Sequence, residues 1–360
     1  MMQELYSDLK IFNFPQKVVD ILEDRLSPPI HIRLKPTNRC NHKCYYCCYR
    51  NKNLFLNQLF NGSDEIPYKK MEKLILDLSE MGVKAVTLSG GGEPLYYPHI
   101  KETVTQLINS KIKVAVLTNG SLLKGDIAEI LSKKATWIRI SMDALDSQTY
   151  VKIRKTGSDE FNKVCKNIYN FAKIKNSNCQ LGVNFIVMKE NYKNLYKFLK
   201  LMKGLGVNHV KISEAIVSTG KETNKKYYSS LLKSVKAQIA KGIIDLSGNR
   251  FSIIDKFDDF NKKNDCYQKQ YNRCPFIQCL TVIGADMNLY TCQDKAYTKA
   301  GKLGSLKGKS FKKLWFSEKV KKRFFELNPS KDCTHHCTQH NKNLMLLNYF
   351  GLDEEHLEFV

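Results

Sequence analysis

The chain has 360 residues, of which 42% are hydrophobic and 26% charged, and its formal net charge is +23. This composition is typical of a soluble globular protein, and no apolar run is long enough to span a membrane. The lysines are spread along the whole chain, so nucleic-acid binding, which needs a clustered basic footprint, is not expected. The N-terminus mixes charged and apolar positions, unlike a secretory signal, which predicts a cytoplasmic protein. In that reducing compartment, 12 cysteines favour metal or redox chemistry over disulfides.

Short apolar runs alternate with amphipathic segments from residue 30 to residue 215. The predicted strands are residues 30–36, 84–92, 113–120, 136–143, 180–188 and 208–215. The predicted helices are residues 69–82, 98–110, 126–134, 161–174 and 192–206. Such βα units build a parallel sheet through right-handed crossovers, so we predict an α/β fold, a partial (β/α)6 barrel of the TIM type. Functional residues are expected at the carboxyl ends of its strands.

The pattern changes after the last of these strands. A polar turn and a basic helix come first, and from Cys266 onward the chain is rich in cysteines and turn residues. We therefore predict a large α/β domain followed by a small cysteine-dense module. The expected divisions are an N-terminal extension (1–29), the partial barrel (30–215), a helical linker (216–265), the cysteine-rich module (266–340) and a C-terminal tail (341–360).

The segment "NRCNHKCYYCCYR" places Cys40, Cys44 and Cys47 in one loop directly after the first predicted strand. Three thiolates at this spacing can hold three irons of a [4Fe–4S] cluster and leave the fourth iron open. A structural zinc ion needs four ligands, and His42, the nearest candidate for a fourth, has an unusual spacing for that role. The cysteines without a predicted partner are Cys48, Cys165, Cys179 and Cys266.

The pattern CxxxCxΦC, in which the aromatic Tyr46 precedes Cys47, resembles that of radical S-adenosylmethionine (SAM) enzymes. The resemblance implies that SAM binds the open iron and that one electron cleaves it to methionine and a 5′-deoxyadenosyl radical, which abstracts hydrogen from a substrate. A flavodoxin or ferredoxin-like electron donor follows from the same resemblance.

Further motifs of this family lie at successive strand ends. "SGGGEP" resembles the GGE motif that holds the amino group of methionine, "LTNG" resembles a turn after the next strand, and "RISMDA" resembles a third strand end. An arginine in the position of Arg154 binds the methionine carboxylate in related enzymes, although a surface arginine is an equally good reading here. The resemblance thus implies cofactor-binding roles for Tyr46, Gly91, Gly92, Glu93, Asn119, Ser141 and Arg154.

The C-terminal segments "CPFIQCLTVIGADMNLYTCQDK", "GKLGSL" and "CTHHC" resemble the SPASM/twitch extension of the same family. A hairpin between Cys279 and Cys292 would bring these residues to Cys333 and Cys337, giving four ligands for an auxiliary [4Fe–4S] cluster, with Cys274 as a substitute for Cys279. Too few cysteines are present for two complete auxiliary clusters. The alternative is a zinc site made by Cys292, Cys333 and Cys337 with His335, His336 or His340.

The resemblance predicts a radical SAM enzyme but leaves its substrate and its catalytic residues open. We expect a small polar substrate, a carbohydrate or nucleotide-linked sugar that is oxidised or dehydrated, and the net positive charge favours an anionic one. About thirty residues precede the first strand, too few for the leader-binding domain common in peptide maturases. The alternatives are a peptide- or protein-modifying maturase and, more remotely, a non-catalytic zinc protein that binds RNA.

Overall fold

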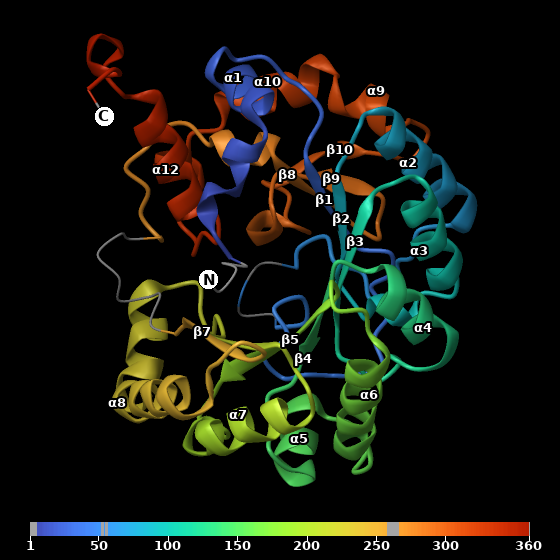
Figure 1. Cartoon of the computed structure of the whole chain (residues 1–360). Coiled ribbons are helices and arrows are strands. Elements are labelled where there is room, and N and C mark those ends of the chain that lie inside the picture. Colours follow the sequence, from blue (N-terminus) through green and yellow to red (C-terminus); the bar gives the residue numbers. More distant parts are fainter. Residues whose placement is uncertain (1–5, 52–53, 55–56, 258–265, 360) are drawn as a thin grey trace.

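A curved ten-stranded sheet forms the centre of the molecule in the computed structural model, which describes residues 6–51, 54, 57–257 and 266–359 (Figure 1). The strand order is β10-β9-β8-β1-β2-β3-β4-β5-β6-β7, and β1 to β7 are parallel. The strands are β1 (His31–Leu34), β2 (Ala85–Leu88), β3 (Lys113–Thr118), β4 (Trp137–Ser141), β5 (Gln180–Val187), β6 (His209–Glu214), β7 (Ser252–Lys256), β8 (Leu280–Ile283), β9 (Asn288–Tyr290) and β10 (Lys302–Ser305).

Helices cover the outer face of this sheet, so the inner face is left for a site (Figure 1). In the barrel they are α2 (Tyr68–Glu80), α3 (Ile100–Asn109), α4 (Gly125–Lys134), α5 (Ser147–Arg154), α6 (Glu160–Ile174), α7 (Leu195–Gly204) and α8 (Lys221–Leu246). Outside it are α1 (Pro15–Leu22), α9 (Phe311–Trp315), α10 (Glu318–Glu326), α11 (Pro329–Asp332) and α12 (His340–Phe350). No helix among the described residues combines the length and apolarity that a bilayer span requires.

Local sequence explains these elements. In α2 the buried residues are Met71, Leu74, Ile75 and Leu78, whose spacing places them on one face of a helix. In β1 burial alternates along the strand, with Ile32 and Leu34 fully buried, as expected for a strand with two different faces. The α/β architecture and the six predicted barrel strands are confirmed.

The sheet continues beyond the six predicted barrel strands on both sides. The segment 216–265, predicted to be a helical linker, contains α8 but also β7, which extends the sheet beyond β6; residues 258–265 lie outside the described part. At the other edge, β8 of the cysteine-rich module pairs in parallel with β1, with Val282 opposite Arg33. The module therefore continues the barrel sheet, and its hairpin of β8 and β9 has the predicted position in the sequence.

The N-terminal extension and the C-terminal tail pack together. Ile11, Val18 and Ile21 form an apolar cluster with Leu346 of α12 and with Cys279. The backbone carbonyl of Cys279 accepts hydrogen bonds from the N–H groups of residues 30 and 31, so this cluster lies at the amino ends of β1 and β8. The two terminal segments thereby cover the end of the barrel opposite to the predicted site.

Candidate active site

A cavity of about 390 Å³ lies at the carboxyl ends of the barrel strands, within the range usual for small-ligand pockets. It gathers residues from loops after β1, β2 and β3, from the end of β4 and from the end of α5. The residues predicted for the first cluster and for SAM binding all line it: Cys40, Cys44, Tyr46, Cys47, Gly91, Gly92, Glu93, Asn119, Ser141 and Arg154. Tertiary structure thus brings together at one site residues that are separated by more than one hundred positions.

The cysteine loop is held in place by the end of α5. The N–H of Lys43 donates to the carbonyl of Arg154 at 3.0 Å, and the N–H of Tyr45 donates to the carbonyl of Ile153 at 3.2 Å. The last carbonyls of a helix have no partner within the helix, so they are available to a neighbouring loop. These bonds fix the loop between its three predicted cluster ligands.

The glycines of the "SGGGEP" loop are required by the chain that precedes Cys40. A Cβ on Gly92 would lie 2.0 Å from the carbonyl oxygen of Arg39, and one on Gly91 would lie 1.9 Å from Oδ1 of Asn38. The two segments are hydrogen-bonded, with the N–H of Glu93 donating to the carbonyl of Arg39 at 2.9 Å. Only glycine allows this approach, which brings the glycine loop against the cysteine loop.

The Glu93 carboxylate is buried and accepts three hydrogen bonds. The hydroxyl of Thr118 donates to Oε1 at 2.6 Å, and the N–H groups of Asn119 and Leu95 donate to Oε2 at 2.7 Å and to Oε1 at 3.0 Å. Burial raises the pKa of Glu93, although these bonds act in the opposite direction. This side chain therefore ties the glycine loop to the end of β3.

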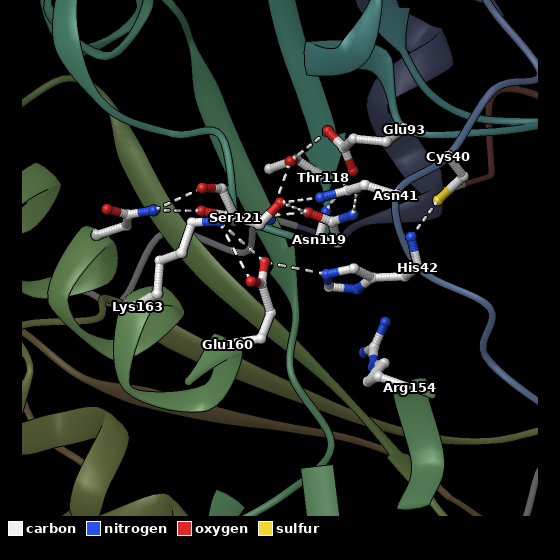
Figure 2. Close-up of polar contacts among 12 residues, drawn as sticks. Cys40, Asn41, His42, Glu93, Thr118, Asn119, Ser121, Arg154, Glu160 and Lys163 are labelled. Carbon is white, nitrogen blue, oxygen red and sulfur yellow. Dashed lines mark hydrogen bonds and ion pairs between the residues drawn. The ribbon is translucent and has the colours of Figure 1, made fainter. Parts of the chain in front are cut away.

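Asn119 continues this network toward the cysteine loop, as Figure 2 shows. Its Nδ2 donates to Oδ1 of Asn41 at 2.8 Å, and its Oδ1 accepts from the N–H and the hydroxyl of Ser121. Asn41 lies directly after Cys40. The interactions seen for Asn119 thus position the loop, and a direct contact with the cofactor remains a prediction.

A buried ion pair stands beside the cysteines. Arg154 pairs through Nη2 with the carboxylate of Asp143, and its Nη1 lies 3.5 Å from Sγ of Cys44. The hydroxyl of Tyr46 donates to the same carboxylate at 2.6 Å. Arg154 is only 3% exposed, so it is not a surface arginine. A charge at this depth is retained in proteins when it is paired, as it is here with Asp143.

Sequence reasoning missed two residues of this site. Asp143 lies in "RISMDA", the segment for which only Ser141 was predicted to bind the cofactor. A lone carboxylate at the end of an apolar strand could have indicated Asp143. Lys35 is fully buried at the end of β1, where Nζ donates to the hydroxyl of Tyr49 at 2.7 Å and to the carbonyl of Gly90 at 2.8 Å. Burial, followed by the charge of Arg33, lowers the pKa of Lys35 to about 7. The sequence feature that could have indicated Lys35 is a cation directly after an apolar strand.

His42, considered above as a fourth ligand, is directed to a carboxylate instead. Its Nε2 lies 3.3 Å from Oε1 of Glu160 (Figure 2), and its Nδ1 is buried without a hydrogen-bond partner in the described chain. Burial, followed by the charge of Arg154, lowers the pKa of His42 to about 4. The histidine is therefore neutral near pH 7.

The C-terminal thiols form a second group that includes Cys274 and not Cys279. Burial and then Cys292 and Cys333 raise the pKa of Cys274, whereas the charges that act on Cys279 are those of Lys17 and Lys342. The pKa of Cys337 is raised by burial first, then by the charge of Asp294 and then by Cys274 and Cys292. Cys279 packs instead in the apolar cluster with Ile11, Val18, Ile21 and Leu346. We therefore propose Cys274, and not Cys279, as the fourth ligand.

This group of thiols is not gathered as a single zinc ion requires. Among the described residues, no three Cys, His, Asp or Glu side chains converge closely enough to hold one metal ion. His340, one of the alternative zinc ligands, has its Nδ1 at 3.2 Å from the hydroxyl of Tyr271. The thiols are thus spaced more loosely than a tetrahedral zinc site.

Comparison with known proteins identifies the family. The model described as "Radical SAM superfamily" matches residues 34–202. Residues 34–202 belong to the radical SAM superfamily. This confirms the resemblance found in the cysteine motif. Membership implies a [4Fe–4S] cluster and SAM as cofactors. The cavity fits them, because Cys40, Cys44 and Cys47 line it from one loop, together with Cys48, and buried polar groups surround them.

Curated relatives match the radical SAM domain at low identity. An uncharacterized protein of Methanocaldococcus jannaschii is 27% identical over 50% of this chain and 60% of its own length. A probable GTP 3′,8-cyclase of the same organism is 29% identical over 56% of this chain and 63% of its own. The chain thus spans about six tenths of the length of these relatives.

Solved structures share the fold over almost the whole chain. Streptococcus suis SuiB bound to the precursor peptide SuiA has a TM-score of 0.62 at 17% identity, covering 89% of this chain and 73% of SuiB. The enzyme anSMEcpe with bound AdoMet has a TM-score of 0.59 at 17% identity, covering 90% of this chain and 97% of its own. At such identities the likeness concerns the fold.

Replacing Glu93 with glutamine should loosen the junction of the glycine loop and β3. An amide has one oxygen, so either Thr118 or the N–H of Asn119 loses its acceptor, at a cost of about 1–3 kcal/mol in the free energy of unfolding. Urea unfolding of Glu93→Gln measures this cost. The control is Glu102→Gln, at an exposed position of α3. Equal stability of Glu93→Gln and the wild type would contradict the assigned role.

Proposed function

We propose that the chain is a radical SAM enzyme that oxidises or dehydrates a carbohydrate or a nucleotide-linked sugar. The observation that carries the proposal is the convergence of Cys40, Cys44, Cys47 and the glycine loop on one cavity. When bound, the cluster and SAM supply a 5′-deoxyadenosyl radical that abstracts a hydrogen atom from the substrate. The chain's own part is to hold the cysteine loop through α5 and to bury Arg154 and Asp143 beside it.

A site between the barrel and the cysteine-rich module is proposed for the substrate. Gln293 of this module forms part of the wall of the cavity that would also hold the cluster and SAM. Several relatives of the radical SAM domain are named probable GTP 3′,8-cyclases, which favours a substrate with a nucleotide part. A flavodoxin or ferredoxin-like protein is the proposed electron donor.

Modification of a peptide is the second candidate function. It is favoured by the extent of the fold likeness, since SuiB, solved with its precursor peptide, matches 89% of this chain. The two candidates differ in what binds the cavity, because a peptide must enter as an extended chain whereas a sugar nucleotide can be enclosed.

Anaerobic assays test the proposal and separate the candidates. Reconstituted protein with dithionite and SAM should release 5′-deoxyadenosine, and sugar nucleotides and short peptides are then compared as accelerators of this release. Acceleration by sugar nucleotides alone is the expected result. Acceleration by peptides alone would replace the first candidate with the second, and the absence of any 5′-deoxyadenosine would refute both.

A further inference from the structure

Two arginines of the barrel strands lie on the inner face of the sheet. Arg33 of β1 lines the 390 Å³ cavity itself. Arg139 of β4 stands two residues before Ser141, which also lines the cavity, and pairs in register with the lining residue Leu117 of β3. Because residues two apart in a strand point to the same side, Arg139 shares the face that forms the cavity.

Neither guanidinium has a charged hydrogen-bond partner within the described part of the chain. The Nε atoms of Arg33 and Arg139 are both buried and donate to no hydrogen-bond partner there. Arg139 donates from Nη1 to the hydroxyl of Tyr6 at 3.1 Å and lies 5.7 Å from the ring of Trp137, both neutral groups. Asp294 acts on Arg33 only at longer range, and its Oδ2 already accepts two hydrogen bonds from Thr338.

The charge of Arg139 acts on Arg33. Burial lowers the pKa of Arg33, and the charge of Arg139 is the next largest cause. Arginine does not lose its proton in proteins, so both groups stay charged. Because the Nε atoms of both arginines are buried, two like charges without a counter-ion here cost free energy, and a protein that keeps them is less stable than one without them. An anion in the cavity would offset this cost.

We propose that Arg33 and Arg139 bind an anionic group of the substrate, a phosphate or a carboxylate, inside the barrel. The inference rests on the proposed function, because it assigns the substrate's anchor in the same cavity. The forked guanidinium matches the oxygens of either group in a bidentate manner. Anchors on β1 and β4 are rigid, so the rest of the substrate is oriented relative to the cysteine loop at the ends of these strands.

Anion binding is measured on reconstituted protein with saturating SAM. Inorganic phosphate and succinate are titrated by calorimetry against sodium chloride at equal ionic strength, and the midpoint of thermal unfolding is recorded for each. Wild type should bind at least one probe. Arg33→Gln and Arg139→Gln should each weaken it about tenfold or more. The control is Lys197→Gln, which removes an exposed charge from α7 and should bind as wild type does.

Stability without an anion separates a binding role from a structural one. Because Arg33→Gln and Arg139→Gln remove a repulsion, their unfolding midpoints without phosphate or succinate should equal or exceed that of wild type. Lower midpoints together with unchanged binding of the probes would overturn the inference, as would phosphate that displaces SAM. Release of 5′-deoxyadenosine is measured in parallel: if it occurs while neither probe binds, the anion site fails and the proposed function stands.

Binding of one probe identifies the chemistry of the group. Phosphate binding that depends on Arg33 and Arg139 supports a phosphorylated or nucleotide-linked substrate. Succinate binding with the same dependence supports a carboxylate, and binding of both supports a general anion site. Each of these results supports the site, and they differ only in the source of the negative charge.

Discussion

Replacing Cys40, Cys44 and Cys47 together with alanine is expected to lower the iron content from about eight to about four per chain and to abolish the release of 5′-deoxyadenosine. These thiols line the cavity at the spacing expected for the SAM-binding cluster, and they lie in one loop held by α5. Loss of the open iron removes the site at which SAM is reduced. Iron and sulfide per chain, together with 5′-deoxyadenosine under dithionite, measure the effect.

The control for this experiment is Cys165→Ala. Cys165 packs against the hydrophobic core from α6 and is not part of either thiol group, so the variant should keep the wild-type iron and activity. Four irons in the wild type would leave the radical SAM reaction in place and remove the auxiliary cluster. Release of 5′-deoxyadenosine by the triple variant would refute the assignment of the three ligands.

Replacing Cys274 with alanine is expected to remove the auxiliary cluster, whereas Cys279→Ala should retain it. The reason is that Cys274 lies within electrostatic range of Cys292, Cys333 and Cys337 of the same module. We expect about four irons per chain in Cys274→Ala and about eight in Cys279→Ala. Iron analysis and the cluster's absorbance in the visible range measure the difference.

Cys279→Ala is the matched control and has an expected effect of its own. Its thiol packs with Ile11, Val18 and Leu346, so the smaller alanine should cost about 1 kcal/mol of stability without loss of iron. Loss of iron from Cys279→Ala with full iron in Cys274→Ala would restore the original prediction. Equal loss from both would mean that Cys279 supports the module indirectly.

The gathering of Cys40, Cys44 and Cys47 in one cavity could be predicted from the sequence because the three cysteines lie close together in the chain. The spacing of Cys40, Cys44 and Cys47 is a local property that no distant contact can change. The glycine loop and Asn119 were predictable for a related reason, since successive parallel strands end at the same edge of a sheet. The structure places all of them in one cavity. The hydrogen bonds between the loops, such as those of Glu93 to the end of β3, could not be predicted from the sequence.

The second thiol group could not be predicted in the same way. Cys274 and Cys279 are five positions apart and equally plausible by spacing, yet one packs near Cys333 and the other in the apolar cluster of the two termini. The choice depends on how the chain turns before β8 pairs with β1, which is a contact between residues about 250 positions apart. The strand β7 was not predicted, because it is only five residues long and follows a long helix.

The sequence by itself determined the class of this protein and its parallel βα barrel, and it predicted the ligands of the first cluster, because periodicity and local spacing specify elements and loop motifs directly. Only the tertiary structure decided which side chains meet. The pairing of Arg154 with Asp143, the separation of Cys279 from the other thiols and the approach of Arg33 to Arg139 all depend on which faces of distant strands and helices pack together. Packing of that kind is set by the whole core, and no short stretch of sequence contains it.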